Sequence, residues 1–184
     1  MAPLRTIKKA LLAIALLVAS LAVYTLAARH FGTVIPPAMA APDLQADLVV
    51  VNKPKRIMQL LQNGKVIRAY RVSLGGHPVG HKEREGDERT PEGLYAIDWR
   101  NRNSSAYLSL HISYPAPADV ARAAAAGENP GGNIMIHGLA NGWGFLGSLH
   151  LFWDWTDGCI AVTNAEMREV WSLVPDGTPV QIDG

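Results

Sequence analysis

The chain has 184 residues, of which 48% are hydrophobic and 18% charged, enough apolar material for one packed domain and too little charge for a disordered chain. The formal net charge of +1 provides no basic surface, so nucleic acid is excluded as a predicted partner. The single cysteine excludes an internal disulfide framework and zinc sites built from cysteine clusters.

The first 28 residues predict a membrane-spanning helix. An apolar run from Ala10 to Ala28 follows the basic residues Arg5, Lys8 and Lys9. At about 1.5 Å per residue, a helix of this length can cross the ~30 Å hydrocarbon core of a bilayer. Basic residues before the run predict a cytoplasmic N-terminus and export of the remainder. Residues 1–28 are therefore interpreted as a signal anchor that connects the protein to the membrane.

Two alternatives to the anchor stay open. Ala38-Met39-Ala40 fits the site of a cleaved signal peptide, although it lies about ten residues beyond the apolar run. The run could also form a helix buried in the core. Residues 29–45 contain three prolines and are predicted to be a linker. Residues 1–40 hold four basic and no acidic residues, so the exported part keeps 13 basic against 16 acidic residues, a net charge of −3.

Residues 46–183 alternate short apolar runs with turn residues, which is typical of a mostly β domain. The predicted strands are residues 47–51, 56–61, 65–74, 94–99, 108–113, 133–137 and 178–182. Short helices are predicted over 117–126 and 165–173, the second capped by Thr163 or Asn164. The polar segment 76–93 is predicted to be a loop, its charged residues in solvent. The predicted fold class is mainly β, a mixed β-sandwich or barrel-like domain with short helices, preceded by the N-terminal hydrophobic helix.

Cys159 is the first candidate for chemistry. Gly158 immediately before it allows a tight turn, whose backbone amides could point at a developing oxyanion. A thiol at such a turn would be partly exposed and open to activation by a nearby base. The alternative is a buried, inert cysteine.

His137 is the second candidate. It ends the apolar strand Ile134-Met135-Ile136 and is followed by Gly138, a position that could aim a base into a cleft. If the fold brings His137 to Cys159, the imidazole could take the thiol proton and later return it to a leaving amine. The alternative is a hydrogen-bonded histidine at a strand end.

The pattern Ile136-His137-Gly138, followed about twenty residues later by Thr156-Asp157-Gly158-Cys159, resembles the catalytic signature of L,D-transpeptidases of the YkuD type. The resemblance covers residues 46–183. It extends to the ordered upstream segments Val72-Ser73-Leu74-Gly75, Gly80-His81-Lys82, Gly86-Asp87, Arg89-Thr90-Pro91-Glu92-Gly93 and Leu110-His111-Ile112-Ser113-Tyr114-Pro115.

The resemblance implies a cysteine enzyme of the bacterial cell envelope that acts on peptidoglycan stem peptides. Cys159 would be the nucleophile and His137 the general base. The oxyanion would be held at Gly158 and Asp157, together with the Cys159 amide. Carbapenems would acylate Cys159 if its pocket resembles those of the family. No cofactor and no metal is implied.

Two residues depart from the common family signature. Asp157 stands where a histidine is usual and Ala161 where an arginine is common. Asp157 could orient a nearby histidine or cap the turn. The loss of the arginine leaves donor and acceptor preference open.

The segment between His137 and Cys159 is rich in aromatic residues and glycines. It is interpreted either as a flap packed on the core or as a lid over a peptide groove. His150, within it, is expected to be a surface histidine. The substrate-binding positions that we predict are Gly138, Thr156, Trp143 and Trp155.

Three functions follow from this interpretation. The first is an L,D-transpeptidase that makes cross-links. The second is an L,D-carboxypeptidase, or a hydrolase that releases peptide or protein from peptidoglycan with the same residues. The third is a catalytically silent peptidoglycan-binding module.

Overall fold

The computed structural model describes residues 2–31 and 34–184. Met1, and Gly32 and Thr33 of the predicted linker, lie outside the described residues. The helices are α1 (Ala2–Phe31), the 3-10 helix η1 (Pro42–Leu44), α2 (Pro117–Ala125), the 3-10 segment η2 (Gly144–Phe152) and α3 (Asn164–Leu173). The strands are β1 (Leu48–Asn52), β2 (Ile57–Gln62), β3 (Lys65–Arg71), β4 (Gly93–Asn101), β5 (Ser109–Ile112), β6 (Met135–His137), β7 (Ile160–Ala161) and β8 (Pro179–Asp183).

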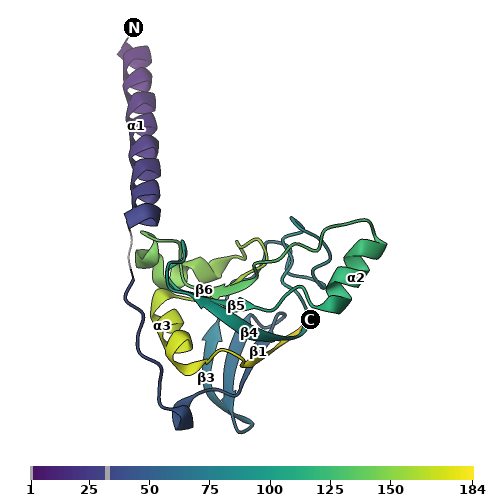
Figure 1. Cartoon of the computed structure of the whole chain (residues 1–184). Coiled ribbons are helices and arrows are strands. Elements are labelled where there is room, and N and C mark those ends of the chain that lie inside the picture. The colour runs from purple at the N-terminus through teal and green to yellow at the C-terminus, as the bar shows by residue number, and fades with distance from the viewer. Residues whose placement is uncertain (1, 32–33) are drawn as a thin grey trace.

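The strands within the described residues form one eight-stranded sheet in the order β3-β2-β1-β8-β4-β5-β6-β7 (Figure 1). β1 pairs with β8 and β6 with β7 in parallel, and the other neighbours are antiparallel. Bridges from Ser73 to Ala161 and from Gly75 to Thr156 connect the chain after β3 to β7 and its approach. The two ends of the strand order therefore meet, and the predicted mainly β, barrel-like class is confirmed.

The core lies inside the curved sheet and beneath α3. The inward positions of the strands are closed to solvent, as at Val49 and Val51 in β1 and Leu110 and Ile112 in β5. α3 buries Met167, Val170 and Trp171 against this core. Strand alternation with a period of two and the amphipathic pattern of α3 explain this arrangement.

The cap of α3 resolves one open prediction. The Thr163 hydroxyl accepts a hydrogen bond from the Glu166 amide at 3.3 Å, and the Glu166 carboxylate accepts one from the Thr163 amide at 2.8 Å. Thr163 is therefore the N-cap, in a capping box, and Asn164 is the first helical residue.

Three elements were not predicted: η1, which lies in the predicted linker, η2 and β7. η2 consists of two short turns that meet at Gly147, where the backbone is not helical. β7 is only two residues long, and its pairing depends on β6 and on Ser73. The predicted strand 65–74 also ends early, at Arg71, because the chain beyond it leaves β2 and turns toward β7.

The linker is held against the domain from Ile35 onward. The Ile35 carbonyl accepts a hydrogen bond from Arg168 at 3.1 Å, and the Ala40 amide donates to Ser172 at 2.8 Å. α1 itself projects away from the domain (Figure 1). Its apolar span Thr6–Ala28 has no buried residues in its most apolar window, so the alternative of a buried core helix is wrong.

Candidate active site

The parallel pair β6–β7 brings His137 and Cys159 to one face of the sheet. His137 pairs with Ala161, and Cys159 lies two residues before Ala161, directly before β7. Side chains two residues apart in extended chain share a face, so this register makes Cys159, just before β7, a diagonal neighbour of His137 on β6. The strand spacing and rise put their Cα atoms about 8 Å apart, within reach of an imidazole and a thiol.

The Cys159 thiol is partly buried, and its sulfur contacts the backbone of the β6 approach. The Met135 amide donates to Sγ at 3.4 Å, and Sγ lies 3.6 Å from the Asn133 carbonyl, to which the thiol donates. Burial raises the pKa of Cys159, and the Asp157 carboxylate adds to this, while the Met135 amide and Lys82 act in the opposite direction. Cys159 is therefore a neutral thiol at rest, and it would need a base to act as a nucleophile.

His137 has the properties of such a base. Its side chain is 8% exposed, and its Nδ1 lies 2.6 Å from the Gly138 carbonyl. A carbonyl only accepts hydrogen bonds, so Nδ1 carries the proton and Nε2 is left as the acceptor. Burial lowers the pKa of His137, more than the Gly138 bond raises it. The imidazole is therefore neutral at rest and able to take a proton at Nε2.

Thr156 holds the turn that carries the thiol. Its hydroxyl donates to the Cys159 carbonyl at 2.7 Å and accepts from the Gly158 amide at 3.2 Å. Asp157 is exposed, and no hydrogen bond or ion pair of its carboxylate is found among the described residues. The turn is thus closed by Thr156, the residue predicted to bind substrate, and the Asp157 side chain points into solvent.

Gly158 cannot be replaced at this turn without backbone movement. Its φ is +122°, and an added Cβ would lie 2.5 Å from the Arg89 carbonyl oxygen. We expect Gly158→Ala to destabilise the fold by about 1–3 kcal/mol through backbone strain alone, and to lower activity more steeply because the Cys159 amide and thiol would shift. Thermal unfolding and product formation of the variant test this. Gly177→Ala is the matched control, because Gly177 also has a positive φ but has no atom within 4 Å of an added Cβ. Equal losses of activity in both variants would contradict the close-contact argument.

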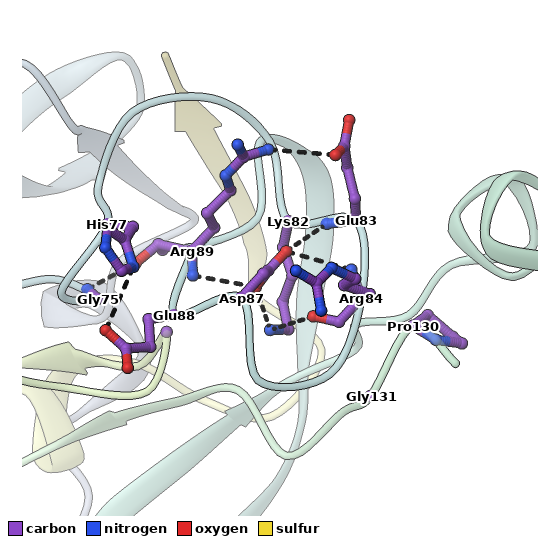
Figure 2. Close-up of polar contacts among 12 residues, drawn as sticks. Gly75, His77, Lys82, Glu83, Arg84, Asp87, Glu88, Arg89, Pro130 and Gly131 are labelled. Atoms are coloured by element: carbon purple, nitrogen blue, oxygen red, sulfur yellow. Dashed lines mark hydrogen bonds and ion pairs between the residues drawn. The ribbon is translucent and has the colours of Figure 1, made fainter. Parts of the chain in front are cut away.

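The loop 76–92 packs against the turn at Gly158. An added Cβ on Gly75 would collide with the Glu88 carbonyl, and the Gly158 turn rests on Arg89. Figure 2 shows the polar contacts that hold the loop, including a Lys82–Asp87 ion pair of 2.8 Å whose side chains are 3% and 8% exposed. Burial alone would raise the pKa of Asp87, but Lys82 and three backbone amides more than offset this and lower it to about 2. The expectation that the charged residues of this loop all lie in solvent is therefore wrong for Lys82 and Asp87.

The two histidines of this loop have separate partners. His77 lies 3.3 Å from the Glu88 carboxylate, whereas His81 contacts the Glu92 backbone and lies 3.1 Å from Asp119. Among the described residues, no group of three or more metal-ligating side chains converges.

Asn164 organises the loop that follows the base. Its Oδ1 accepts from the Leu139 amide at 2.8 Å. A Cβ on Gly138 would lie 2.7 Å from this Oδ1 and 2.9 Å from Tyr107 Cβ. Gly138 is therefore small because the α3 N-terminus approaches it closely, which supplies a packing reason for a residue predicted to bind substrate. The sequence indicated Asn164 only as an alternative cap.

The aromatic segment forms an apolar cavity beside the base. The cavity has a volume of about 280 Å³ and is lined by Leu139, Ala140, Trp143, Leu146, His150, Trp153 and Trp155. Trp155 also contacts the His137 ring edge-on, with 5.8 Å between centroids. The predicted residues Trp143 and Trp155 thus share one cavity next to His137.

His150 is a buried residue of this cavity, so the expectation of a surface histidine is wrong. It is 2% exposed, and burial lowers its pKa. Its Nδ1 accepts from the Trp155 indole at 3.4 Å, because an indole N–H only donates. The proton therefore sits on Nε2, which has no partner among the described residues.

A row of side chains crosses the same face of the sheet toward Cys159. Trp99 pairs with His111 across β4 and β5, and His111 pairs with Met135 across β5 and β6. His111 also contacts Asp98 at 2.6 Å and stacks on Trp99, which is 41% exposed. The sequence indicated His111 only as part of a matching segment, because its place in this row depends on the pairing of β4, β5 and β6.

Comparison with known proteins gives the family and the fold. The family model of the L,D-transpeptidase catalytic domain, YkuD, matches residues 46–182. Among curated proteins, none matches the chain.

Three solved structures of other proteins are similar to this chain. The helical cell shape determining protein Pgp2 of Campylobacter jejuni is 22% identical with a TM-score of 0.57, and the match covers 78% of this chain and 52% of that one. Bd1075 of Bdellovibrio bacteriovorus is 18% identical with a TM-score of 0.52, and the match covers 79% and 50%. The L,D-transpeptidase of Xylanimonas cellulosilytica is 18% identical with a TM-score of 0.47, and the match covers 81% and 65%. The first two matches span about half the length of those chains, and the likeness concerns the fold.

Proposed function

This chain belongs to the YkuD family of L,D-transpeptidase catalytic domains, and on that premise we propose that it is a cysteine L,D-transpeptidase acting on peptidoglycan stem peptides. The observation that carries the proposal is the register of the β6–β7 pair, which aligns His137 with Ala161, two residues after Cys159. A neutral thiol and a neutral imidazole there fit a general-base mechanism, in which the proton moves only when substrate is attacked.

In the first half-reaction, Nε2 of His137 takes the thiol proton and Sγ of Cys159 attacks the carbonyl carbon of the donor peptide. The peptide C–N bond breaks, and the leaving D-alanine amine receives the proton from His137. The product is a thioester between Cys159 and the shortened stem. In the second half-reaction, His137 takes a proton from an acceptor amine. That amine attacks the thioester, a new amide forms, and the thiol regains its proton.

The oxyanion of each step would form beside the turn before β7. The Gly158 amide is engaged by the Thr156 hydroxyl at 3.2 Å, and no acceptor for the Cys159 amide is found among the described residues. We therefore assign the principal donor to the Cys159 amide, with the Gly158 amide shared between Thr156 and the oxyanion. Asp157, whose side chain faces solvent, would contribute only through its backbone.

The substrate would lie across the face that carries the nucleophile. The cavity beside His137, with Trp143 and Trp155 in its lining, provides apolar surface on one side of the thiol. The row of Trp99, His111 and Met135 provides a mixed surface on the other. An extended stem peptide could contact both while its carbonyl reaches Cys159.

One feature favours a second candidate, hydrolysis by the same residues. Ala161 is fully buried in β7 opposite His137, where many relatives have an arginine according to the resemblance above. The nearby cation Lys82 is paired with Asp87. Because Lys82 is already paired, it has less capacity to hold an anionic acceptor, so water could resolve the thioester instead.

The products of the full-length protein with tetrapeptide muropeptides, analysed by mass spectrometry, distinguish these functions. Cross-linked dimers that are absent from a Cys159→Ala control are the expected result. Tripeptides without dimers would replace the transpeptidase assignment by a carboxypeptidase. No change in either sample would contradict both, and protein-linked peptidoglycan would then be the substrate to test for the releasing hydrolase.

We also propose that the domain works in the cell envelope and is attached by α1. The family acts on peptidoglycan, and the span Thr6–Ala28 is long and apolar enough to cross a membrane. Basic residues precede it, which favours a cytoplasmic N-terminus and an exported domain.

A further inference from the structure

We propose that η2 presents a membrane-contacting surface, which rests against the bilayer in which α1 is anchored. The surface, called here the η2 patch, consists of Phe145, Leu149, Phe152 and Trp153. The inference rests on the proposed retention of α1, and it does not depend on the reaction that Cys159 performs.

The η2 patch is strongly exposed. Phe145 is 73% exposed, Leu149 53%, Phe152 80% and Trp153 57%. The other side of the same segment is packed inward, with His150 buried and Leu146 lining the cavity. η2 thus has apolar side chains both toward the protein interior and toward the outside. This is typical of a segment that is covered by apolar material on both sides. Large apolar side chains that are exposed close together in the chain are typical of surfaces that bind proteins or membranes.

The composition around the η2 patch favours a lipid surface. No Asp, Glu, Lys or Arg occurs between Glu128 and Asp154. Tryptophan and other amphipathic aromatic residues are enriched at the level of lipid headgroups, where an apolar ring and a polar edge are both satisfied. The exported part has a net charge of −3, so attraction to anionic lipids would not hold it, and the contact must be apolar.

The linker keeps the domain close to the bilayer. The apolar span ends at Ala28, and Ile35 is already hydrogen-bonded to Arg168 of α3. Seven residues of chain reach at most about 25 Å when fully extended. Arg168 also contacts Tyr107, whose backbone amide donates to Asn141, so the tether point adjoins the loop that leads into η2.

Direct contacts connect that loop to the end of the span. The Tyr24 hydroxyl donates to the Gly142 carbonyl at 2.9 Å, and an added Cβ on Gly142 would lie 2.7 Å from Ala28 Cβ. Tyr24 lies within the apolar span, one turn before its end, which places it about 6 Å inside. Gly142 is therefore level with the membrane interface, and Figure 1 shows the green segment after β6 at the foot of α1.

Spin-label accessibility of the full-length protein in phosphatidylcholine nanodiscs tests the proposal. A nitroxide is attached at Phe152→Cys in a Cys159→Ala background, and its collision rates with oxygen and with a water-soluble nickel chelate are measured. The matched control is Val66→Cys, because Val66 is 50% exposed in β3, and Figure 1 shows β3 on the side of the domain away from α1. We expect the label at 152 to favour oxygen several-fold more than the label at 66, independently of salt.

A second variant distinguishes insertion of the η2 patch into the bilayer from simple closeness of the domain to the bilayer. A label at Leu149→Cys is expected to lose its oxygen preference when Phe145 and Phe152 are both replaced by serine. Equal accessibility of the labels at 152 and 66 would overturn the proposal. Shielding of the label at 152 from both reagents would also overturn it, because that result indicates a protein or peptide partner. The proposal would likewise fail if the intact mass of the protein purified from membranes showed that its chain begins at Ala41. None of these outcomes changes the muropeptide products that test the proposed function.

Discussion

Cys159→Ala is expected to eliminate product formation, with a loss on the order of 10⁴-fold or more in kcat. It is also expected to remove the mass increase that a carbapenem would give by acylating the thiol. Both effects have one cause, since no other thiol exists in the chain to form a thioester. Intact-mass measurement after incubation with the carbapenem, beside the muropeptide assay, provides the two readouts.

Cys159→Ser is the informative companion variant. A serine hydroxyl keeps the size and the contacts with Met135 and Asn133, but its much higher pKa makes it a poor nucleophile for a neutral imidazole to activate. We expect a folded, nearly inactive protein with an unchanged unfolding temperature. Retained activity in Cys159→Ala, or a carbapenem adduct on that variant, would reject Cys159 as the nucleophile.

His137→Gln is expected to lower kcat by about 10²–10⁴-fold, the usual contribution of a positioned general base. Glutamine can still donate to the Gly138 carbonyl, so the loop after β6 should keep its geometry while the basic nitrogen is lost. The matched control is His77→Gln, because His77 is exposed and contacts Glu88 rather than the thiol. Steady-state kinetics of both variants test this, and equal effects of the two substitutions would contradict the assignment.

The pH dependence follows from the burial of His137. Burial lowers the pKa of His137, so the active neutral form persists below the ordinary range of histidine. The wild-type kcat/KM is therefore expected to stay level through that range and to fall only at more acidic pH, as the imidazole gains a proton. His137→Gln should lack this acid limb. A decline centred at the ordinary histidine pKa would mean that another group controls the reaction.

Folding stability should show the same direction. A histidine whose pKa is lower in the folded than in the unfolded state binds protons more tightly when unfolded, so its contribution to stability is present at neutral pH and decreases on acidification. His150, also buried with a lowered pKa, adds to this. The free energy of unfolding should therefore decrease on acidification, through His137 in the candidate site and His150 in the cavity beside it.

Local patterns in the chain were sufficient for much of the architecture. Strand alternation, turn residues between the strands and the cap at Thr163 or Asn164 each depend on residues within a few positions of one another. They predicted most strands and α3 within a few residues. η2 and β7 escaped prediction because glycines interrupt the first, and the second is a strand only by virtue of its neighbours.

Residue type and short spacing along the chain are enough to indicate the candidate pair His137 and Cys159, a glycine that allows a tight turn before the thiol, and the apolar N-terminal helix. Four further features emerge only in the folded chain: β6 and β7 pair in parallel, Arg89 lies against the Gly158 turn, His150 is buried, and Gly142, in the loop before η2, contacts Tyr24 of α1. These contacts join residues far apart in the chain, and their stability comes from packing the whole sheet and its helices, which no local pattern contains.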